Sequence, residues 1–211
     1  MSEDRIFVVD DNTNARSSLR ALLESAGYEV LDYASAMEFL EQDEALGSCL
    51  IADIRMPEMT GMDLHEMLVK RGSKLPVIFI TGYGSVPLTV RAMNAGAIDF
   101  LEKPFDDETL LASLNKALGI ARRDREISKE AASANELISQ LTPRELEVLE
   151  QLVAGRSSKL VASELNISPR TVEVHRAHIK NKLHARCLSD LVRTALAASK
   201  RGSTNLRGQT P

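Results

Sequence analysis

The sequence predicts an α/β fold class: a doubly wound five-stranded parallel sheet, followed by a helical linker and a small all-α domain of four helices. In the first half, short β-branched apolar runs alternate with stretches of helical period. The second half has clear helix starts and apolar repeats but lacks a strand pattern. The 211 residues are 44% hydrophobic, so the chain is long and apolar enough for two small domains.

Five apolar runs are the expected strands: Ile6–Asp10, Tyr28–Tyr33, Cys49–Asp53, Val77–Thr81 and Ile98–Leu101. Segments such as Ala15–Ala26 and Met62–Arg71 have apolar residues three and four apart and lie between these runs. Because helices separate the strands, we expect parallel pairing through βαβ crossovers. In such sheets the functional groups gather at the carboxyl ends of the strands.

The first domain is expected to span residues 1–119. Residues 120–140 contain no Pro or Gly, and they favour a helical linker over a disordered tether. Residues 141–200 form the second domain, and residues 201–211, which lack an apolar face, are expected to be a disordered tail. The four helix starts are a capping box at Thr142–Glu145, Ser157 or Ser158, Ser168 before Pro169, and a position near Ser189.

Charge is distributed unevenly between the two halves. Residues 1–119 carry 10 Lys and Arg against 20 Asp and Glu, a net charge of −10. Residues 141–211 carry 12 against 6, a net charge of +6, and residues 120–140 are balanced. The basic second half is therefore expected to bind a polyanion such as nucleic acid.

The compartment is expected to be the cytoplasm. No apolar run reaches the roughly 18–20 residues needed to span a bilayer, and the charged first residues do not resemble a signal peptide, so no membrane partner is expected. Cys49 and Cys187 are too far apart in sequence to suggest a CxxC motif, and they are typical of thiols in a reducing compartment.

Five polar residues, namely three carboxylates, one hydroxyl and one ammonium group, lie at or just after the ends of predicted strands. Parallel pairing of the strands would bring them to one edge of the sheet. They are Asp10, Asp11, Asp53, Thr81 and Lys103. A cluster of carboxylates suits a hard cation such as Mg²⁺. Asp53 is the candidate nucleophile toward a phosphoryl group because it alone lies on the presumed central strand. Thr81 would then bind a phosphoryl oxygen, and Lys103 would balance the charge.

Residues 5–118 resemble a response-regulator receiver domain of the flavodoxin-like fold. The resemblance rests on four motifs in family order: Val9-Asp10-Asp11, Asp53-Ile54-Arg55-Met56-Pro57, Ile80-Thr81-Gly82 and Phe100-Leu101-Glu102-Lys103-Pro104-Phe105. It implies that Asp53 accepts a phosphoryl group from a phosphohistidine of a cognate sensor histidine kinase. It also implies that the backbone carbonyl of Arg55 joins Asp10, Asp11 and Asp53 as a metal ligand, and that Thr81 and Phe100 move together as a switch.

The segment from Ser168 to Leu183 is predicted to be a helix with two different faces. At about 100° per residue, Val172, Ile179 and Leu183 form a narrow apolar stripe. The opposite face carries Arg170, Glu173, Val174, Ala177, Lys180 and Asn181. Such a helix can enter a major groove of DNA, where these side chains can contact base edges.

Residues 141–198 resemble the LuxR/NarL-type helix-turn-helix domain. The resemblance rests on Leu141-Thr142-Pro143-Arg144-Glu145, Gly155-Arg156-Ser157-Ser158-Lys159, Ile167-Ser168-Pro169-Arg170-Thr171-Val172, Val174-His175 and Leu191-Val192. It implies that Glu173, Val174 and Ala177 face the bases. It further implies that phosphate or base contacts come from Lys159, Arg170, Arg176 and Lys180.

Together the two resemblances indicate the NarL/FixJ family. The receiver is similar to the FixJ branch in the stretches Thr81-Gly82-Tyr83-Gly84-Ser85-Val86-Pro87 and Ala92-Met93-Asn94-Ala95-Gly96-Ala97-Ile98-Asp99-Phe100. They imply a transcription factor, not an enzyme, that forms a homodimer when phosphorylated and binds paired half-sites in promoter DNA. Relatives of this type are mostly activators, which makes RNA polymerase an expected partner.

Three alternatives remain at this stage. A phosphohydrolase would use an aspartyl phosphate, although the haloacid-dehalogenase type needs a second Asp where Arg55 stands. The protein could bind DNA constitutively, or the receiver could mask the helix-turn-helix. A zinc site at His175, His178, His184 and Cys187 is not expected, because the spacing fits no common zinc finger. His65 is expected to face solvent.

Overall fold

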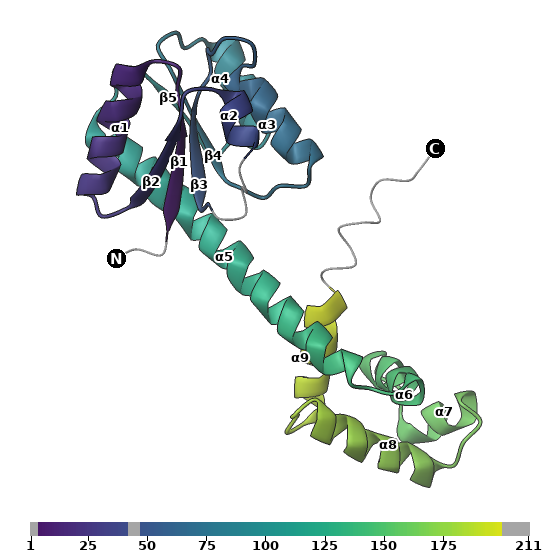
Figure 1. The fold of residues 1–211 in the computed structure, drawn as a ribbon. Coiled ribbons are helices and arrows are strands. Elements are labelled where there is room, and N and C mark those ends of the chain that lie inside the picture. The colour runs from purple at the N-terminus through teal and green to yellow at the C-terminus, as the bar shows by residue number, and fades with distance from the viewer. Residues whose placement is uncertain (1–3, 42–46, 200–211) are drawn as a thin grey trace. The chain divides into compact units, whose positions relative to one another are not determined.

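The structure is a computed structural model that describes residues 4–41 and 47–199. Its five strands are all parallel and lie in the order β2-β1-β3-β4-β5 (Figure 1). Their bounds are β1 Arg5–Val9, β2 Glu29–Tyr33, β3 Cys49–Asp53, β4 Val77–Thr81 and β5 Asp99–Glu102. This order confirms the predicted doubly wound parallel sheet, with β3 at its centre.

Helices cover both faces of the sheet. Their bounds are α1 Thr13–Ser25, α2 Ala36–Leu40, α3 Gly61–Lys70, α4 Val86–Asn94 and α5 Asp107–Ser139. Alternate residues of the strands enter two separate cores, because successive side chains of a strand point to opposite faces. Phe7 and Phe79 pack with α2, α3 and α4, while Ile6 and Ile78 pack with α1 and the start of α5. Every residue of β3 and β4 is therefore buried, as expected for central parallel strands.

Helix α5 continues without a break from the first predicted domain through the predicted linker. It is 33 residues long, so the segment is helical as expected. The boundary between the two compact units of the chain falls within it, between Asp124 and Arg125. In the first unit, Arg122 of α5 donates hydrogen bonds to the buried carboxylate of Asp4, which ties the helix to the start of β1.

Up to residue 199, where the described part of the chain ends, the second unit contains four further helices: α6 Pro143–Val153, α7 Ser158–Glu164, α8 Pro169–Lys182 and α9 Leu188–Ser199. Their apolar side chains form one core that includes Val148, Val161, Val172, Ile179 and Leu191. The predicted capping box is present, because Thr142 accepts a hydrogen bond from the Glu145 amide and Glu145 accepts one from the Thr142 amide. Ser157 and Ser168 cap α7 and α8 as predicted.

The last helix starts close to the predicted position near Ser189. Helix α9 begins at Leu188. The side chain of Asp190 accepts a hydrogen bond from the Arg186 amide at 2.9 Å, and it thereby stabilises the start of this helix.

The predicted tail at residues 201–211 lies outside the described residues. Among the described helices, none is both long and apolar enough to cross a lipid bilayer.

Candidate functional site

Three of the predicted strand-end residues meet at the carboxyl edge of the sheet. Asp10 follows β1, Asp53 ends β3, and Lys103 follows β5. The Nζ atom of Lys103 donates hydrogen bonds to Asp10 Oδ2 at 2.7 Å and to Asp53 Oδ1 at 2.8 Å. Asp10 is 1% exposed and Asp53 is 6% exposed, so two buried carboxylates share one ammonium group. Residues separated by 93 and 50 positions are thus brought together by the order of the strands.

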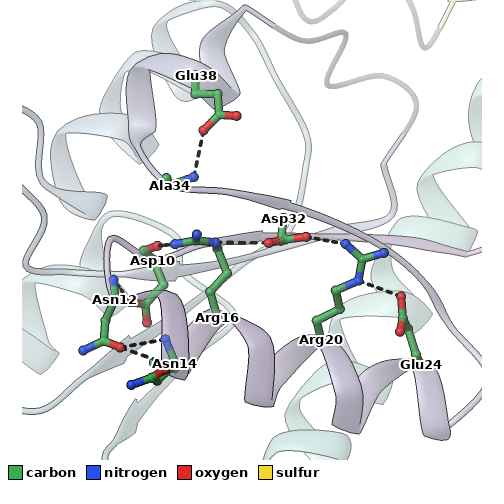
Figure 2. Close-up of polar contacts among 10 residues, drawn as sticks. Asp10, Asn12, Asn14, Arg16, Arg20, Glu24, Asp32, Ala34 and Glu38 are labelled. Carbon is green, nitrogen blue, oxygen red and sulfur yellow. Dashed lines mark hydrogen bonds and ion pairs between the residues drawn. The ribbon is translucent and has the colours of Figure 1, made fainter.

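Asp10 is held on both its side chain and its main chain (Figure 2). Its Oδ1 atom accepts a hydrogen bond from the Asn12 amide at 2.8 Å, and its carbonyl accepts one from Arg16 Nη1 at 2.6 Å. The same guanidinium pairs with Asp32 of β2, whose other oxygen accepts from Arg20. These bonds leave Asp10 little freedom to turn away from Asp53 and Lys103.

Asp53 is fixed by its local backbone and by a glycine. Its Oδ2 atom accepts a hydrogen bond from the Arg55 amide at 2.7 Å. A Cβ atom at Gly61 would lie 2.3 Å from the Asp53 carbonyl oxygen, so α3 can begin beside the end of β3 only with glycine there. Burial raises the pKa of the Asp53 carboxyl above its ordinary value, and the Lys103 ammonium offsets this only in part.

Lys103 is the cation of the cluster. Burial disfavours its charged form, but hydrogen bonds to Asp10 and Asp53 outweigh that effect and raise the pKa of its ammonium group. Its backbone amide donates to the Thr81 carbonyl at 2.7 Å, which anchors the end of β5 beside β4. The bond from Lys103 to Pro104 is cis, a conformation that the sequence allows but does not dictate.

Thr81 and Phe100 lie on the two neighbouring strands β4 and β5. Thr81 is fully buried, and its hydroxyl oxygen accepts a hydrogen bond from the Tyr83 amide at 3.2 Å. Phe100 is half-buried and packs against the core that faces α3 and α4. Beside them the Arg55 guanidinium lies over the exposed ring of Tyr83, 4.3 Å from its centroid, in a cation–π contact.

Asp11 does not join the cluster as expected. It is exposed, whereas the preceding Asp10 is buried. Asp11 lies in a bend that follows the end of β1, and its side chain faces solvent there. Within residues 4–41 and 47–199, no group of three or more His, Cys, Asp or Glu side chains is placed to hold a metal ion. The expected triad of carboxylates is therefore a buried pair, Asp10 and Asp53, with Asp11 outside it.

Helix α8 has the two faces that the sequence predicts. Val172 and Ile179 are fully buried, and Leu183 is 4% exposed. The residues of the opposite face are all exposed: Arg170, Glu173, Val174, Ala177, Lys180 and Asn181. Lys159 of α7 is exposed as well. The turn between α7 and α8 includes Asn166 with φ of 54°, a left-handed conformation that Asn tolerates better than most residues.

Arg176 differs from the other predicted DNA contacts because it already has partners within the protein. Its Nη1 atom donates to Ser158 Oγ at 2.7 Å and to Glu173 Oε1 at 3.1 Å. Ser158 in turn donates to the same Glu173 oxygen at 2.7 Å. Hydrogen bonds among these three side chains therefore connect α7 to the exposed face of α8.

Comparisons with known proteins agree with both parts of the chain. Residues 6–115 match the response regulator receiver domain, and residues 139–195 match the bacterial regulatory proteins of the luxR family. The chain is a response regulator of the NarL/FixJ family. The transcriptional regulatory protein FixJ of Bradyrhizobium diazoefficiens is 42% identical over 93% of this chain and 97% of its own length. FixJ of Azorhizobium caulinodans is 43% identical over 92% of each chain.

Solved structures give the same result for this response regulator. The low-resolution structure of the response regulator StyR is 41% identical, with a TM-score of 0.81 over 92% of this chain and 99% of that one. Full-length FixJ from B. japonicum is also 41% identical, with a TM-score of 0.57 over 95% of this chain and 99% of that one. The response regulator is thus a transcription factor with a receiver and a LuxR-type DNA-binding domain.

The response regulator contains a buried ionic network that the sequence did not reveal. Glu145 of α6 has a side chain only 4% exposed, and it accepts a hydrogen bond from Lys182 Nζ of α8 at 2.7 Å. His178 Nδ1 lies 3.7 Å from its other oxygen. The bond from Lys182 and the capping bonds from Thr142 hold the pKa of the Glu145 carboxyl at about 2. The capping motif indicated Glu145, but no local signal indicated its partner 37 residues away.

His65 of the response regulator does not face solvent as expected. It is 6% exposed on α3, and its ring meets Phe79 of β4 edge to face with centroids 5.6 Å apart. Burial lowers the pKa of its imidazole. Its Nδ1 atom has no hydrogen-bond partner among the described residues. The expectation was wrong because the buried face of α3 is wider than the stripe of Leu64 and Leu68 and includes His65 as well.

Proposed function

We propose that phosphorylation of Asp53 by a cognate sensor histidine kinase controls how this transcription factor binds promoter DNA. The observation that carries the proposal is the sharing of the Lys103 ammonium by two buried carboxylates at the carboxyl edge of the sheet. A buried aspartate beside a fixed cation suits phosphoryl transfer, because the cation can balance the charge that the aspartate gains.

Each side chain has a distinct role in this proposal. The phosphorus–nitrogen bond of the kinase phosphohistidine breaks, and a phosphorus–oxygen bond to an oxygen of Asp53 forms. Lys103 pairs with the new phosphoryl oxygens, and the Thr81 hydroxyl donates a hydrogen bond to one of them. Before phosphoryl transfer, the Thr81 hydroxyl accepts a hydrogen bond from the Tyr83 amide. Reorientation of Thr81 would break this bond, release the loop that contains Tyr83, and let Phe100 shift together with Thr81.

Mg²⁺ fits the donor chemistry of this edge, since the candidate ligands are all oxygen atoms and a cation already lies between two of them. The ligands would be the buried carboxylates of Asp10 and Asp53, the backbone carbonyl of Arg55, and the carboxylate of Asp11, which is exposed and would have to turn toward the ion. When bound, the ion would supply positive charge that offsets the charge of the phosphoryl group.

Helix α4 offers a surface for the homodimer that we propose to form on phosphorylation. Val86, Val90 and Met93 are 78%, 51% and 42% exposed, and their spacing places them along one face. The helix follows the Thr81–Tyr83 segment directly, so a change at Thr81 reaches it through only a few residues. An exposed apolar stripe beside a switch segment is suited to a contact between two receivers.

We expect Val90→Glu to block this dimer without blocking phosphorylation. A carboxylate in the centre of an apolar interface would be desolvated without a partner. Gel filtration after acetyl phosphate treatment should show a monomer that carries the phosphoryl mass on Asp53. Val69→Glu, at a 54% exposed position on α3, is the matched control and should still form a dimer. A dimer of the Val90→Glu protein would contradict this assignment of the interface.

The exposed face of α8 is proposed to enter the major groove at each half-site, with Glu173, Val174 and Ala177 toward the bases. Lys159, Arg170 and Lys180 would contact phosphates or bases, and Arg176 would lie beside them. Two such helices in a dimer would bind paired half-sites together, so the gain in affinity comes from effective concentration.

Lys159→Ala should weaken DNA binding by a similar factor for every sequence, because a phosphate contact carries no base information. The slope of log K against log salt should become less steep by about one unit. Lys129→Ala removes the same charge from an exposed position on α5 and should leave both quantities unchanged. A loss confined to one sequence would show that Lys159 contacts a base.

The names of the relatives support a role in the regulation of transcription. Both FixJ relatives are named as transcriptional regulatory proteins. We propose a cytoplasmic protein that activates transcription and contacts RNA polymerase at its promoters. We further propose domain limits at residues 1–119, 120–140 and 141–200.

The decisive experiment treats the full chain with acetyl phosphate and Mg²⁺ and follows two quantities in the same sample. Mass spectrometry should find one phosphoryl group on Asp53, and operator affinity should rise together with dimer formation. A phosphoryl group on Asp53 without any change in affinity or oligomeric state would contradict the proposed switch. The absence of the adduct would contradict the proposed acceptor.

A further inference from the structure

Glu173 is an unusual base-facing residue because its charge is already matched within the protein. One of its carboxylate oxygens, Oε1, accepts hydrogen bonds from Ser158 Oγ at 2.7 Å and from Arg176 Nη1 at 3.1 Å. Arg176 also donates to Ser158 Oγ at 2.7 Å, so the three side chains form a closed triangle. We call these three residues the recognition triangle.

The recognition triangle determines which atom of Glu173 is available to DNA. Its side chain is 59% exposed, so the carboxylate lies at the surface although two donors hold Oε1. The other oxygen, Oε2, has no partner among the contacts of the triangle. In a major groove a carboxylate oxygen can accept a hydrogen bond from the exocyclic amino group of cytosine. Adenine also presents an amino group there, but its N7 acceptor lies beside that group and would repel a carboxylate, and guanine and thymine present acceptor oxygens that would repel it.

The triangle also reduces the cost of bringing a carboxylate to DNA. A lone carboxylate would be repelled by the phosphates. The Arg176 guanidinium compensates that charge at hydrogen-bond distance. The hydroxyl of Ser158, which comes from α7, is hydrogen-bonded to both the Glu173 carboxylate and the Arg176 guanidinium. It thereby restricts the rotamers of the Glu173 side chain, which would otherwise be mobile.

We propose that Ser158 and Arg176 are positioning residues that set the base preference of Glu173 for an amino-bearing base, cytosine, in the operator. This inference rests on the proposed function, since it requires α8 to lie in the major groove. It assigns Arg176 to charge compensation within the protein instead of a phosphate contact. It also gives Ser158, which has no charge and no base-facing position, an effect on sequence recognition.

The test is a binding-site selection with the phosphodonor-treated full chain and a DNA library randomised over the half-site. Glu173→Gln, whose amide can donate as well as accept, should change the preference at one position and thereby identify the base that residue 173 contacts. A good contact gives a preference of about tenfold to a hundredfold for one base over the others at that position. Ser158→Ala should reduce this preference by several-fold. Ser158→Thr keeps the hydroxyl and should restore the preference. Ser163→Ala, at an exposed serine of the same helix, is the control and should match wild type.

The outcomes separate this inference from the proposed function. If the wild-type protein selects no sequence, the proposed function fails. If wild type selects a sequence but Ser158→Ala keeps the wild-type profile or weakens all sequences equally, only the recognition triangle is wrong. Arg176→Ala should reduce the preference with little change in the salt dependence. A slope less steep by about one unit would show that Arg176 contacts a phosphate, and would overturn its assignment.

Discussion

Asp53→Asn is expected to abolish the phosphoryl adduct and to leave operator affinity unresponsive to acetyl phosphate. The amide cannot act as a carboxylate nucleophile, although it has nearly the same shape. If phosphorylation acts by pairing two DNA-binding domains, the response that is lost should be about a hundredfold in affinity. Mass spectrometry and operator titration, with and without the phosphodonor, measure the two effects in one preparation.

A matched control distinguishes loss of the acceptor from a general effect of removing one negative charge. Asp124→Asn changes a carboxylate on α5 to an amide and should retain both the adduct and the affinity response. Circular dichroism should be the same for the two variants and wild type. If the Asp53→Asn protein responded to acetyl phosphate as wild type does, another residue would be the acceptor and the role of the Lys103 cluster would be wrong.

Glu145→Gln is expected to destabilise the second unit. In wild type the carboxylate, with a side chain 4% exposed, is paired with Lys182 and closes the capping box of α6. The amide retains hydrogen-bonding capacity but leaves the ammonium without its charged partner. The loss of a charged hydrogen bond at a buried site is worth about 1–3 kcal/mol of unfolding free energy.

The pH dependence should change in the same variant. The pKa of Glu145 is held at about 2 in the folded state and lies near 4.5 when the chain is unfolded. A lowered pKa contributes stability above the unfolded value, and this contribution is lost as pH falls from about 4.5 toward 2. The wild-type second unit should therefore lose stability over this range, and the Glu145→Gln unit should lose less.

The composition of the chain allows the two units to be followed separately. The three tyrosines, Tyr28, Tyr33 and Tyr83, all lie in the first unit, and the chain has no tryptophan. In urea, tyrosine fluorescence therefore follows the first unit, while circular dichroism follows both. Glu147→Gln, which breaks an exposed pair on the same helix, should cost at most about 1 kcal/mol. Equal losses for the two variants would contradict the importance of the buried network.

Local pattern was enough to predict most elements and several site residues. The strand ends at Asp53 and Thr81 follow from short apolar runs whose side chains alternate between two buried faces. The helix starts at Thr142 and Ser168 follow from capping side chains that bond to amides within the next turn. These signals are readable because the interacting groups lie within a few residues of one another.

The sequence by itself determined the parallel sheet, the boundaries of helices such as α1, α3 and α8 to within about two residues, and the gathering of Asp10, Asp53 and Lys103 at one edge. Only the tertiary structure decided that Asp11 stays outside the cluster, that His65 is buried, and that Lys182 pairs with Glu145. The same holds for Ser158, which meets Glu173 across two helices. Such contacts depend on the angle and depth at which whole elements pack, and these are set by many side chains together instead of by any local motif.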